Sequence, residues 1–273
     1  SGLDYKTWSD VYQKIISWEL KLDESNTTQM SDILSMQKSE ANAAFSKFII
    51  KNYVKWVNED IEAPVMSNNL MRRKIFPELK SDKPTVMVLM DNLRYDQWKI
   101  LEPIINELYR IDSEETFYSI LPTSTQYSRN SIFSGLMPSE IEEYYPDWWK
   151  NDNEEGGKNL HEADFLSEQI RRTFRKPIKF GYHKITNVYH AKQMQDNVLN
   201  FFVYNFIDML SHARTEMEVL KELAGDETAY RSLTRSWFLH SPLWAALQKI
   251  AERDVQIIIT TDHGTIRVKN PSR

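Results

Sequence analysis

Residues 86–98 read VMVLMDNLRYDQW, and this stretch decides the fold class. Its first five residues, Val86–Met90, are all apolar and have the length of a strand that is buried on both faces. Asp91 and Asn92 end the apolar run, and a helix-like stretch follows from Tyr95 to Tyr109. A buried strand that leads directly into a helix is typical of proteins in which parallel strands alternate with helices.

The same strand pattern recurs further along the chain. The other strand candidates are Phe117–Leu121, Phe201–Ile207 and Val255–Thr261. The helix-like segment Ser241–Glu252 leads into the last of them. This alternation predicts an α/β fold with a mostly parallel sheet that is covered by helices on both faces.

The N-terminal part has a different pattern. Apolar residues recur about every 3.6 positions in Trp8–Leu22 and again in Ile33–Val57, which predicts a helical hairpin or a small bundle. The prolines and charges of residues 61–84 indicate a connector. We therefore expect a small all-α domain at residues 1–80 and an α/β domain at residues 81–273.

Composition excludes several kinds of site. The 273 residues include no cysteine, which excludes disulfide scaffolds, thiolate metal sites and thiol nucleophiles. The seven glycines form no glycine-rich phosphate loop. The net charge of -5, from 34 basic and 39 acidic residues, provides no general attraction to nucleic acid or to an anionic membrane.

Hydropathy argues against a membrane protein. No apolar run approaches the roughly 20 residues of a membrane-spanning helix. The first residues also lack the basic and apolar segments of a signal peptide. The sequence therefore predicts a soluble cytoplasmic protein, or a fragment of one, with no membrane insertion.

Residues able to bind a ligand follow the predicted strands. They are Asp91, Thr123–Thr125, Asp208, Asp262 and His263. In an open parallel sheet, ligands bind beyond the carboxyl ends of the strands, so we expect these side chains to meet. Some also have an ordinary interpretation, because Asp91 or Asn92 could cap one helix and Thr125 could cap another.

Two of these segments contain the residue types of a divalent-metal site. Asp208 and His212 are four residues apart, which places both side chains on one face of a helix. Asp262 and His263 follow a strand candidate rich in β-branched residues, and Gly264 would permit a sharp turn that brings ligands together. The alternatives are a helix in which Asp208 caps the first turn and His212 lies on the surface, and a solvated turn after the last strand.

Residues 146–160 indicate an exposed insertion or lid, because they begin with a proline and contain a polar, glycine-containing run. Four aromatic residues lie at or just before its start: Tyr144, Tyr145, Trp148 and Trp149. They could stack on a nucleic-acid base or, as is more common for such residues, pack the lid onto its own domain.

Together, the segments VMVLMDNLRYDQW, LPTSTQYSRNSIFSG, NFIDMLSHAR and TTDHGT resemble, in order and spacing, the motifs of the alkaline phosphatase superfamily. The resemblance implies two divalent metal ions, with zinc as the expected metal. It implies that one ion is bound by Asp91, Thr125, Asp262 and His263. The other ion is bound, by the same resemblance, by Asp208 and His212.

Residues 122–130, PTSTQYSRN, are similar to the nucleophile segment of the nucleotide phosphodiesterase branch, in which the second threonine attacks. This similarity favours Thr125 over Thr123 as the nucleophile. It implies hydrolysis of a nucleotide or oligonucleotide phosphodiester, short or cyclic, through a phospho-threonine intermediate. Asn130 is the candidate phosphate-binding residue.

The residues of these motifs resemble the PglZ domain more closely still, and in particular the PorX-type response regulators of Bacteroidetes. Those proteins combine a receiver domain, a helical middle domain and a PglZ effector domain. The resemblance implies a part in two-component phosphorelay signalling linked to type IX secretion. The implied partners are a cognate histidine kinase, acting through a receiver domain, and a sigma factor or a secretion-system component. The amphipathic pattern of residues 1–60 further suggests a homodimer.

The superfamily also supplies a downstream histidine to the second metal ion, whereas no histidine follows His263 in this sequence. We therefore expect a fragment without the receiver domain and without the C-terminal end, with weaker metal occupancy at Asp208 and His212. Two other functions stay open from the sequence. One is a non-catalytic zinc-binding module for signalling or dimerisation, and the other is a phosphomonoesterase or phosphomutase with the same metal ligands.

Overall fold

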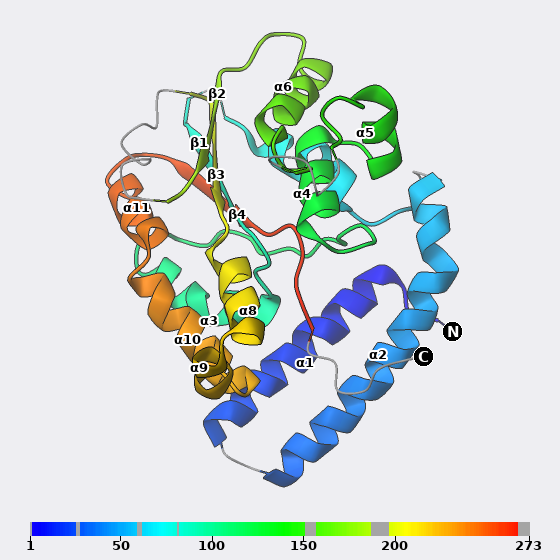
Figure 1. Ribbon diagram of the computed structural model, residues 1–273, viewed down its shortest axis with the longest axis vertical. Helices are drawn as coiled ribbons and strands as arrows, with labels where there is room; N and C mark the ends of the chain where they lie inside the picture. The colour runs from blue at the N-terminus through cyan, green and yellow to red at the C-terminus, as the bar shows by residue number, and fades with distance from the viewer. Residues whose placement is uncertain are drawn as a thin grey trace. The chain divides into compact units, whose positions relative to one another are not determined.

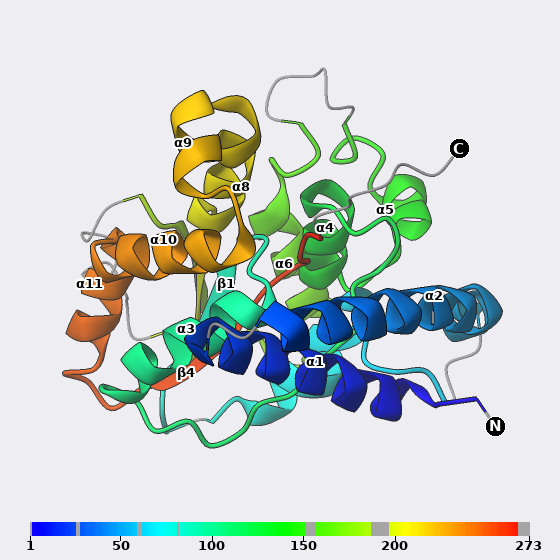
Figure 2. The ribbon, with the colours of Figure 1, turned by 90° about the horizontal axis from the view of Figure 1, so that it is seen from below.

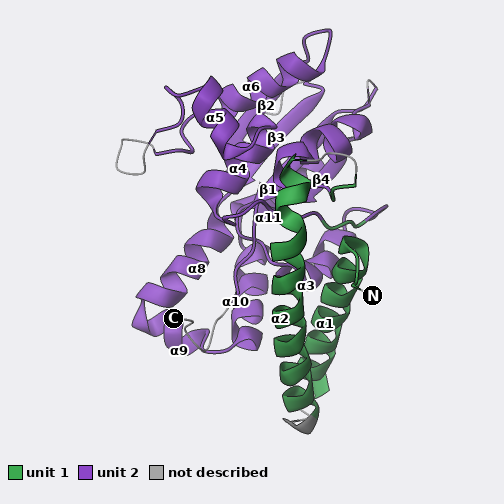
Figure 3. Ribbon diagram, turned by 90° about the vertical axis from the view of Figure 1, so that its right-hand side faces the viewer, with its two compact units in different colours: residues 1–64, 114–116 green, residues 65–113, 117–273 purple. Residues whose placement is uncertain are grey.

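The computed structural model describes residues 2–25, 28–58, 62–80, 82–150, 157–186 and 197–266. The chain divides into two compact units, Ser1–Pro64 with Glu114–Thr116, and Val65–Ser113 with Phe117–Arg273 (Figure 3). The division therefore falls at residue 64, whereas the sequence places the domain boundary near residue 80. In the described ranges, no helix is long and apolar enough to cross a membrane.

The first unit is a helical hairpin made of α1 (Tyr5–Ser25) and α2 (Thr28–Asn58) (Figure 1). The two helices run in opposite directions, because the ring of Tyr5 meets that of Trp56 while Glu19 pairs with Lys38 at 2.5 Å. Trp8 is buried between them. The helical hairpin predicted from the 3.6-residue spacing is confirmed.

Within the described ranges, the second unit is built on a four-stranded parallel sheet with the order β2-β3-β1-β4. Its strands are β1 (Thr85–Met90), β2 (Phe180–Lys184), β3 (Leu199–Tyr204) and β4 (Gln256–Thr260). Val88 of β1 is in register with Phe202 on one side and with Ile259 on the other. All three strand pairings are parallel, so the carboxyl ends of the strands lie at one edge, and the predicted α/β class is confirmed.

Side chains of the central strand alternate between two apolar cores, as the pleat of a buried strand requires. Val86 and Val88 enter one core, and Met87 and Leu89 enter the other. All six residues of β1 are buried, and so are all six of β3. The uninterrupted apolar run in the sequence therefore predicts this strand correctly.

The described helices of this unit are α3 (Tyr95–Asn106), α4 (Thr125–Ser134), α5 (Pro138–Tyr144), α6 (Glu162–Thr173), α8 (Phe206–Glu216), α9 (Glu218–Leu223), α10 (Glu227–Leu239) and α11 (Pro242–Ile250). They cover both faces of the sheet, as the sequence predicts (Figures 1 and 2). One core contains residues of α3, α10 and α11. The other core contains residues of α4, α5 and α6.

The sheet differs from the prediction at two strands. Phe117–Leu121 forms no strand. Tyr118 makes only a single bridge, to Met66, and the N–H of Ile120 donates to Ser67 Oγ instead of to a neighbouring strand. The strand β2 is not expected from the sequence, because its residues FGYHK include a glycine and two polar side chains. β2 pairs with β3 alone and its side chains stay partly exposed, so polar residues are tolerated there, whereas the other edge strand, β4, keeps an apolar run.

Part of the predicted connector belongs to the α/β unit. It forms the short turns η1 (Ser67–Asn69), η2 (Met71–Ile75) and η3 (Phe76–Glu78). Their apolar side chains are buried in the same core as α4 and α6, with Met71 fully buried. This segment therefore helps to close one face of the sheet.

Candidate functional site

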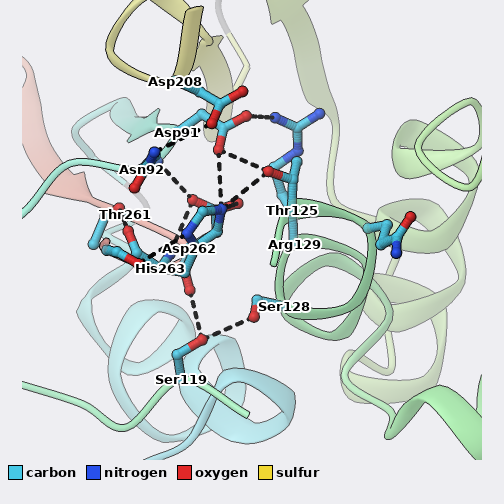
Figure 4. Close-up of polar contacts among 12 residues, drawn as sticks. Asp91, Asn92, Ser119, Thr125, Ser128, Arg129, Asp208, Thr261, Asp262 and His263 are labelled. Atoms are coloured by element: carbon cyan, nitrogen blue, oxygen red, sulfur yellow. Dashed lines mark hydrogen bonds and ion pairs between the residues drawn. The ribbon is translucent and has the colours of Figure 1, made fainter. Parts of the chain in front are cut away.

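Asp91, Thr125, Asp262 and His263 meet at the edge of the sheet where β1 and β4 end (Figure 4). Asp91 directly follows β1, while Asp262 and His263 follow β4. The three side chains are buried, and one ligand atom from each lies within 4.8 Å of the others. Two carboxylates and an imidazole at this spacing suit zinc or another divalent metal ion.

Thr125 is the first residue of α4, and its hydroxyl lies against this group. Its Oγ1 donates to Oδ1 of Asp91 at 3.1 Å and lies 3.0 Å from Nε2 of His263. Ser124, and not Thr125, occupies the N-cap position of the helix. Capping of α4 therefore does not explain why a threonine stands at position 125.

Asp208 and His212 lie one turn apart on α8. The strand predicted at Phe201–Ile207 ends at Tyr204, so Asp208 stands in the first turn of the helix. Nε2 of His212 is 3.5 Å from Oδ2 of Asp208, which places both side chains on one helical face as the spacing predicts. The His212 side chain is 68% exposed, and its ring also lies 4.0 Å from Glu216 on the same helix.

Asn92 is a site residue that sequence reasoning considers only as a helix cap. It has a positive φ of 61°, a conformation that asparagine adopts more readily than most residues. The glycine expected to make the turn, Gly264, is outside the left-handed region. A Cβ there would meet Arg94 Cγ at an ordinary 3.6 Å, so this turn does not require glycine and that expectation is wrong.

A buried arginine, which sequence reasoning missed, lies beside the carboxylates. Arg129 of α4 is 2% exposed and donates to Oδ2 of Asp91 at 2.8 Å. It also forms a buried ion pair with Glu162, which in turn accepts a hydrogen bond from Tyr182. The only local signal for Arg129 is its position four residues after Thr125, which places the two side chains on one face of α4.

Burial changes the proton affinity of these groups. It raises the pKa of Asp91 to about 7, and the negative charge of Asp262 adds to this rise. Burial also raises the pKa of Asp262, against the opposing charge of Arg129. Burial alone would lower the pKa of Arg129, but Glu162 and Asp91 outweigh it, so the net shift is upward and the guanidinium stays charged.

Without metal, the α/β unit should become less stable as the pH rises from 5 to 8. Asp91 holds its proton more tightly in the folded chain than in the unfolded chain, where the pKa of aspartate is about 3.9. Its contribution to stability is complete below about pH 4 and is lost as the pH rises through about 7.

We expect the free energy of unfolding to fall over this range by on the order of 2 kcal/mol more in the wild type than in Asp91→Asn. Denaturant unfolding in the presence of a chelator measures it. An equal pH dependence in the two proteins would contradict the assignment of the raised pKa.

Asn130 makes backbone contacts. Its Nδ2 donates to the carbonyl oxygens of Gln126 and Lys158, both at 2.8 Å. The side chain is fully buried, and its Oδ1 has no partner among the described residues. The described contacts of Asn130 therefore do not include the carboxylates or Thr125.

The aromatic residues near the predicted lid pack against their own unit. Tyr145 stacks on Trp148 with ring centroids 5.0 Å apart, and Trp148 stacks on His161. The Lys158 ammonium lies 4.2 Å from the ring centroid of Trp149. Tyr145, Trp148 and Trp149 therefore pack within the unit, whereas Tyr144 is 58% exposed. Residues 151–156 of the predicted lid lie outside the described residues.

Two family models match this chain. One, described as the BREX system PglZ alkaline phosphatase-like domain, matches residues 70–273. The other, described as the PorX response regulator linker domain, matches residues 1–57. No curated protein matches the chain. The first match contains the whole sheet and every candidate residue of the site, and the second covers the helical hairpin.

Proposed function

The chain belongs to the family of PglZ alkaline phosphatase-like domains, and on this premise we propose that it is a zinc-dependent phosphodiesterase with Thr125 as its nucleophile. The observation that carries the proposal is the meeting of Thr125 Oγ1 with Asp91 and His263, beside Asp262, at the carboxyl edge of the sheet. A hydroxyl, two carboxylates and an imidazole are the groups that metal-assisted phosphoryl transfer to a side chain requires.

The residues present fit a divalent metal ion. Oδ2 of Asp262 is buried and has no hydrogen-bond partner among the described residues, which is unfavourable unless a cation or a proton binds there. We propose that one ion is held by Asp91, Thr125, Asp262 and His263, and a second by Asp208 and His212. When bound, such ions supply positive charge that offsets the carboxylates and the phosphate, and they lower the pKa of the hydroxyl.

Thr125 forms the covalent intermediate in the proposed reaction. Its Oγ1, after losing its proton, bonds to phosphorus, one ester P–O bond breaks, and the alcohol leaves. Before it loses this proton to solvent, the hydroxyl is held from two sides by its hydrogen bond to Asp91 and its contact with His263 Nε2, and the departing alcohol oxygen takes a proton from solvent. Water then cleaves the phospho-threonine ester, which releases a phosphomonoester and restores the hydroxyl.

The N-terminus of α4 supports binding of the phosphate. The first turn of α4 begins at Thr125. Its free backbone N–H groups and the positive end of the helix dipole both lie at this terminus, and both favour binding of an anion. Arg129 has a different role, because its guanidinium is already paired with Asp91 and Glu162. It balances the charge of the carboxylates from the buried side.

The similarity of residues 122–130 to the nucleotide phosphodiesterase branch supports a diester substrate, with short or cyclic oligonucleotides as the proposed class. The match of residues 1–57 to the PorX linker domain supports a role as the effector part of a two-component response regulator. On the same basis we propose a cytoplasmic protein linked to type IX secretion. A histidine kinase would act upstream, and a sigma factor or a secretion-system component would be the partner.

Hydrolysis of bis(4-nitrophenyl) phosphate and of 4-nitrophenyl phosphate tests this proposal. With added zinc, the diester should react faster than the monoester, and a chelator should stop both reactions. Asp262→Asn, which removes the buried charge, should lower diester hydrolysis on the order of 100-fold or more. The matched control Asp112→Asn, at a side chain that is 72% exposed, should leave it unchanged.

The other outcomes identify the alternatives. A faster reaction with the monoester would indicate a phosphomonoesterase or phosphomutase. Stoichiometric zinc binding with no hydrolysis of either ester would indicate a non-catalytic signalling or dimerisation module.

A further inference from the structure

Asn92 stands between the two groups of candidate metal ligands. Its side chain is 2% exposed, and among the described residues it is the one non-glycine residue with a positive φ. A non-glycine residue in this conformation is uncommon and is found where the surrounding structure determines it. In this conformation Asn92 contacts both Asp262 and Asp208.

Asn92 donates hydrogen bonds to two carboxylates that belong to different parts of the chain (Figure 4). Its backbone N–H donates to Oδ1 of Asp262 at 3.1 Å. Its side-chain Nδ2 donates to Oδ1 of Asp208 at 3.2 Å. The other side-chain atom, Oδ1 of Asn92, has no partner among the described residues, so the contact with Asp208 alone determines which way the amide faces.

In both carboxylates, the second oxygen is left near an imidazole. Oδ2 of Asp262 is buried without a hydrogen-bond partner among the described residues and lies 3.7 Å from Nε2 of His263. Oδ2 of Asp208 lies 3.5 Å from Nε2 of His212. Both separations exceed the length of a hydrogen bond. Two atoms bound to one tetrahedral zinc ion, each at about 2.0–2.1 Å, lie about 3.3 Å apart, so both pairs are spaced like two ligands of one ion.

We infer that Asn92 is a positioning residue that decides, alone at Asp208 and together with the backbone N–H of His263 at Asp262, which carboxylate oxygen is left for a metal ion. Its backbone N–H, with that of His263 at 3.0 Å, occupies one oxygen of Asp262, and its side-chain amide occupies one oxygen of Asp208. The left-handed backbone lets one residue reach both. The inference rests on the proposed function, because it concerns the same two ion sites.

The two contacts can be separated experimentally. Asn92→Gly keeps a residue that adopts positive φ freely and keeps the N–H that binds Asp262, but it removes the amide that binds Asp208. Asn92→Asp keeps the size of the side chain but replaces the donor with a negative charge that repels Asp208. Asn106→Gly, at an exposed position at the end of α3, is the matched control.

Zinc titration of the whole chain by calorimetry tests the inference, with cobalt(II) absorption as the spectroscopic readout of the ligand set. In the wild type we expect a tight step and a weaker second step, and Asp208→Asn should remove the second. Asn92→Gly should leave the first step unchanged and raise the dissociation constant of the second by about 10- to 100-fold, the usual effect of losing a residue that orients a ligand. Asn92→Asp should weaken the second step at least as much.

A second step in Asn92→Gly equal to that of the wild type would overturn the inference and leave the proposed function intact. A wild-type titration without a second step would overturn it as well, since no ion would then face Asp208. Absence of any zinc binding by the wild type would overturn both the inference and the proposed function.

Discussion

Replacing Thr125 with alanine is expected to abolish phosphodiester hydrolysis and to leave the fold in place. The substitution removes the hydroxyl that lies 3.1 Å from Asp91 and 3.0 Å from His263. Loss of a catalytic nucleophile lowers kcat by on the order of 10³-fold or more. The measurement is kcat for bis(4-nitrophenyl) phosphate at saturating zinc, with bound metal determined on the same sample.

Two variants make this result specific. Thr125→Ser keeps a hydroxyl and should retain measurable hydrolysis. Thr123→Ala removes an exposed threonine two residues earlier and should behave as the wild type. Acid quenching during turnover should trap a phosphoryl group on the peptide that contains Thr125 in the wild type and not in Thr125→Ala. If Thr125→Ala kept kcat within about 10-fold of the wild type, water rather than threonine would be the attacking group.

Replacing Arg129 with methionine is expected to cost about 3–5 kcal/mol of stability. The substitution leaves Glu162, which is 1% exposed, without its charge partner, and it removes a donor from Asp91. A buried charge without a partner is strongly unfavourable because the protein interior does not solvate it as water does. Denaturant unfolding, monitored by hydrogen exchange of the β1 amides, measures the loss in the free energy of unfolding of the α/β unit alone.

The double variant Arg129→Met with Glu162→Gln should recover part of that stability, because it removes both charges of the pair. Arg171→Met is the matched control, since Arg171 pairs with Glu168 at 2.6 Å but is 69% exposed. A surface pair of this kind contributes at most about 1 kcal/mol. If Arg129→Met were no more harmful than Arg171→Met, the pair with Glu162 would not stabilise the fold.

Arg129 and Asn92 donate hydrogen bonds to different carboxylates of the same site. Arg129 takes Oδ2 of Asp91, so the other oxygen faces Thr125. Asn92 takes one oxygen each of Asp262 and Asp208. In all three carboxylates a hydrogen-bond donor therefore occupies one oxygen, and the second oxygen lies near Thr125 in Asp91, near His263 in Asp262 and near His212 in Asp208. Such outer contacts fix the orientation of ligands before an ion arrives.

Several features of the molecule could be predicted from local sequence. An apolar run of strand length predicts β1, because a strand buried on both faces needs no polar side chain. The four-residue spacing of Asp208 and His212 predicts their shared helical face, because that spacing is one turn of an α-helix. The meeting of strand-end residues follows from parallel pairing, which places all carboxyl ends at one edge.

Other features could not be predicted in this way. The edge strand β2, with the sequence FGYHK, has no apolar run of strand length and so gives no local signal, whereas the other edge strand, β4, contains three successive isoleucines. The apolar segment Phe117–Leu121 has a strand-like composition, yet it finds no neighbouring strand to pair with beyond a single bridge. Pairing is a property of two segments, so one segment alone does not show whether it will occur.

The sequence by itself determined the parallel α/β sheet, the helical hairpin before it, and the residue types available at the strand ends. These follow from the period of the apolar residues and from the chemistry of single side chains, both of which are local. Only the tertiary structure decided that Asn92 makes the left-handed turn in place of Gly264, and that Arg129 pairs with Asp91 and Glu162. Those contacts join residues from 33 to 170 positions apart, and they form because buried polar groups must find partners once the chain has folded.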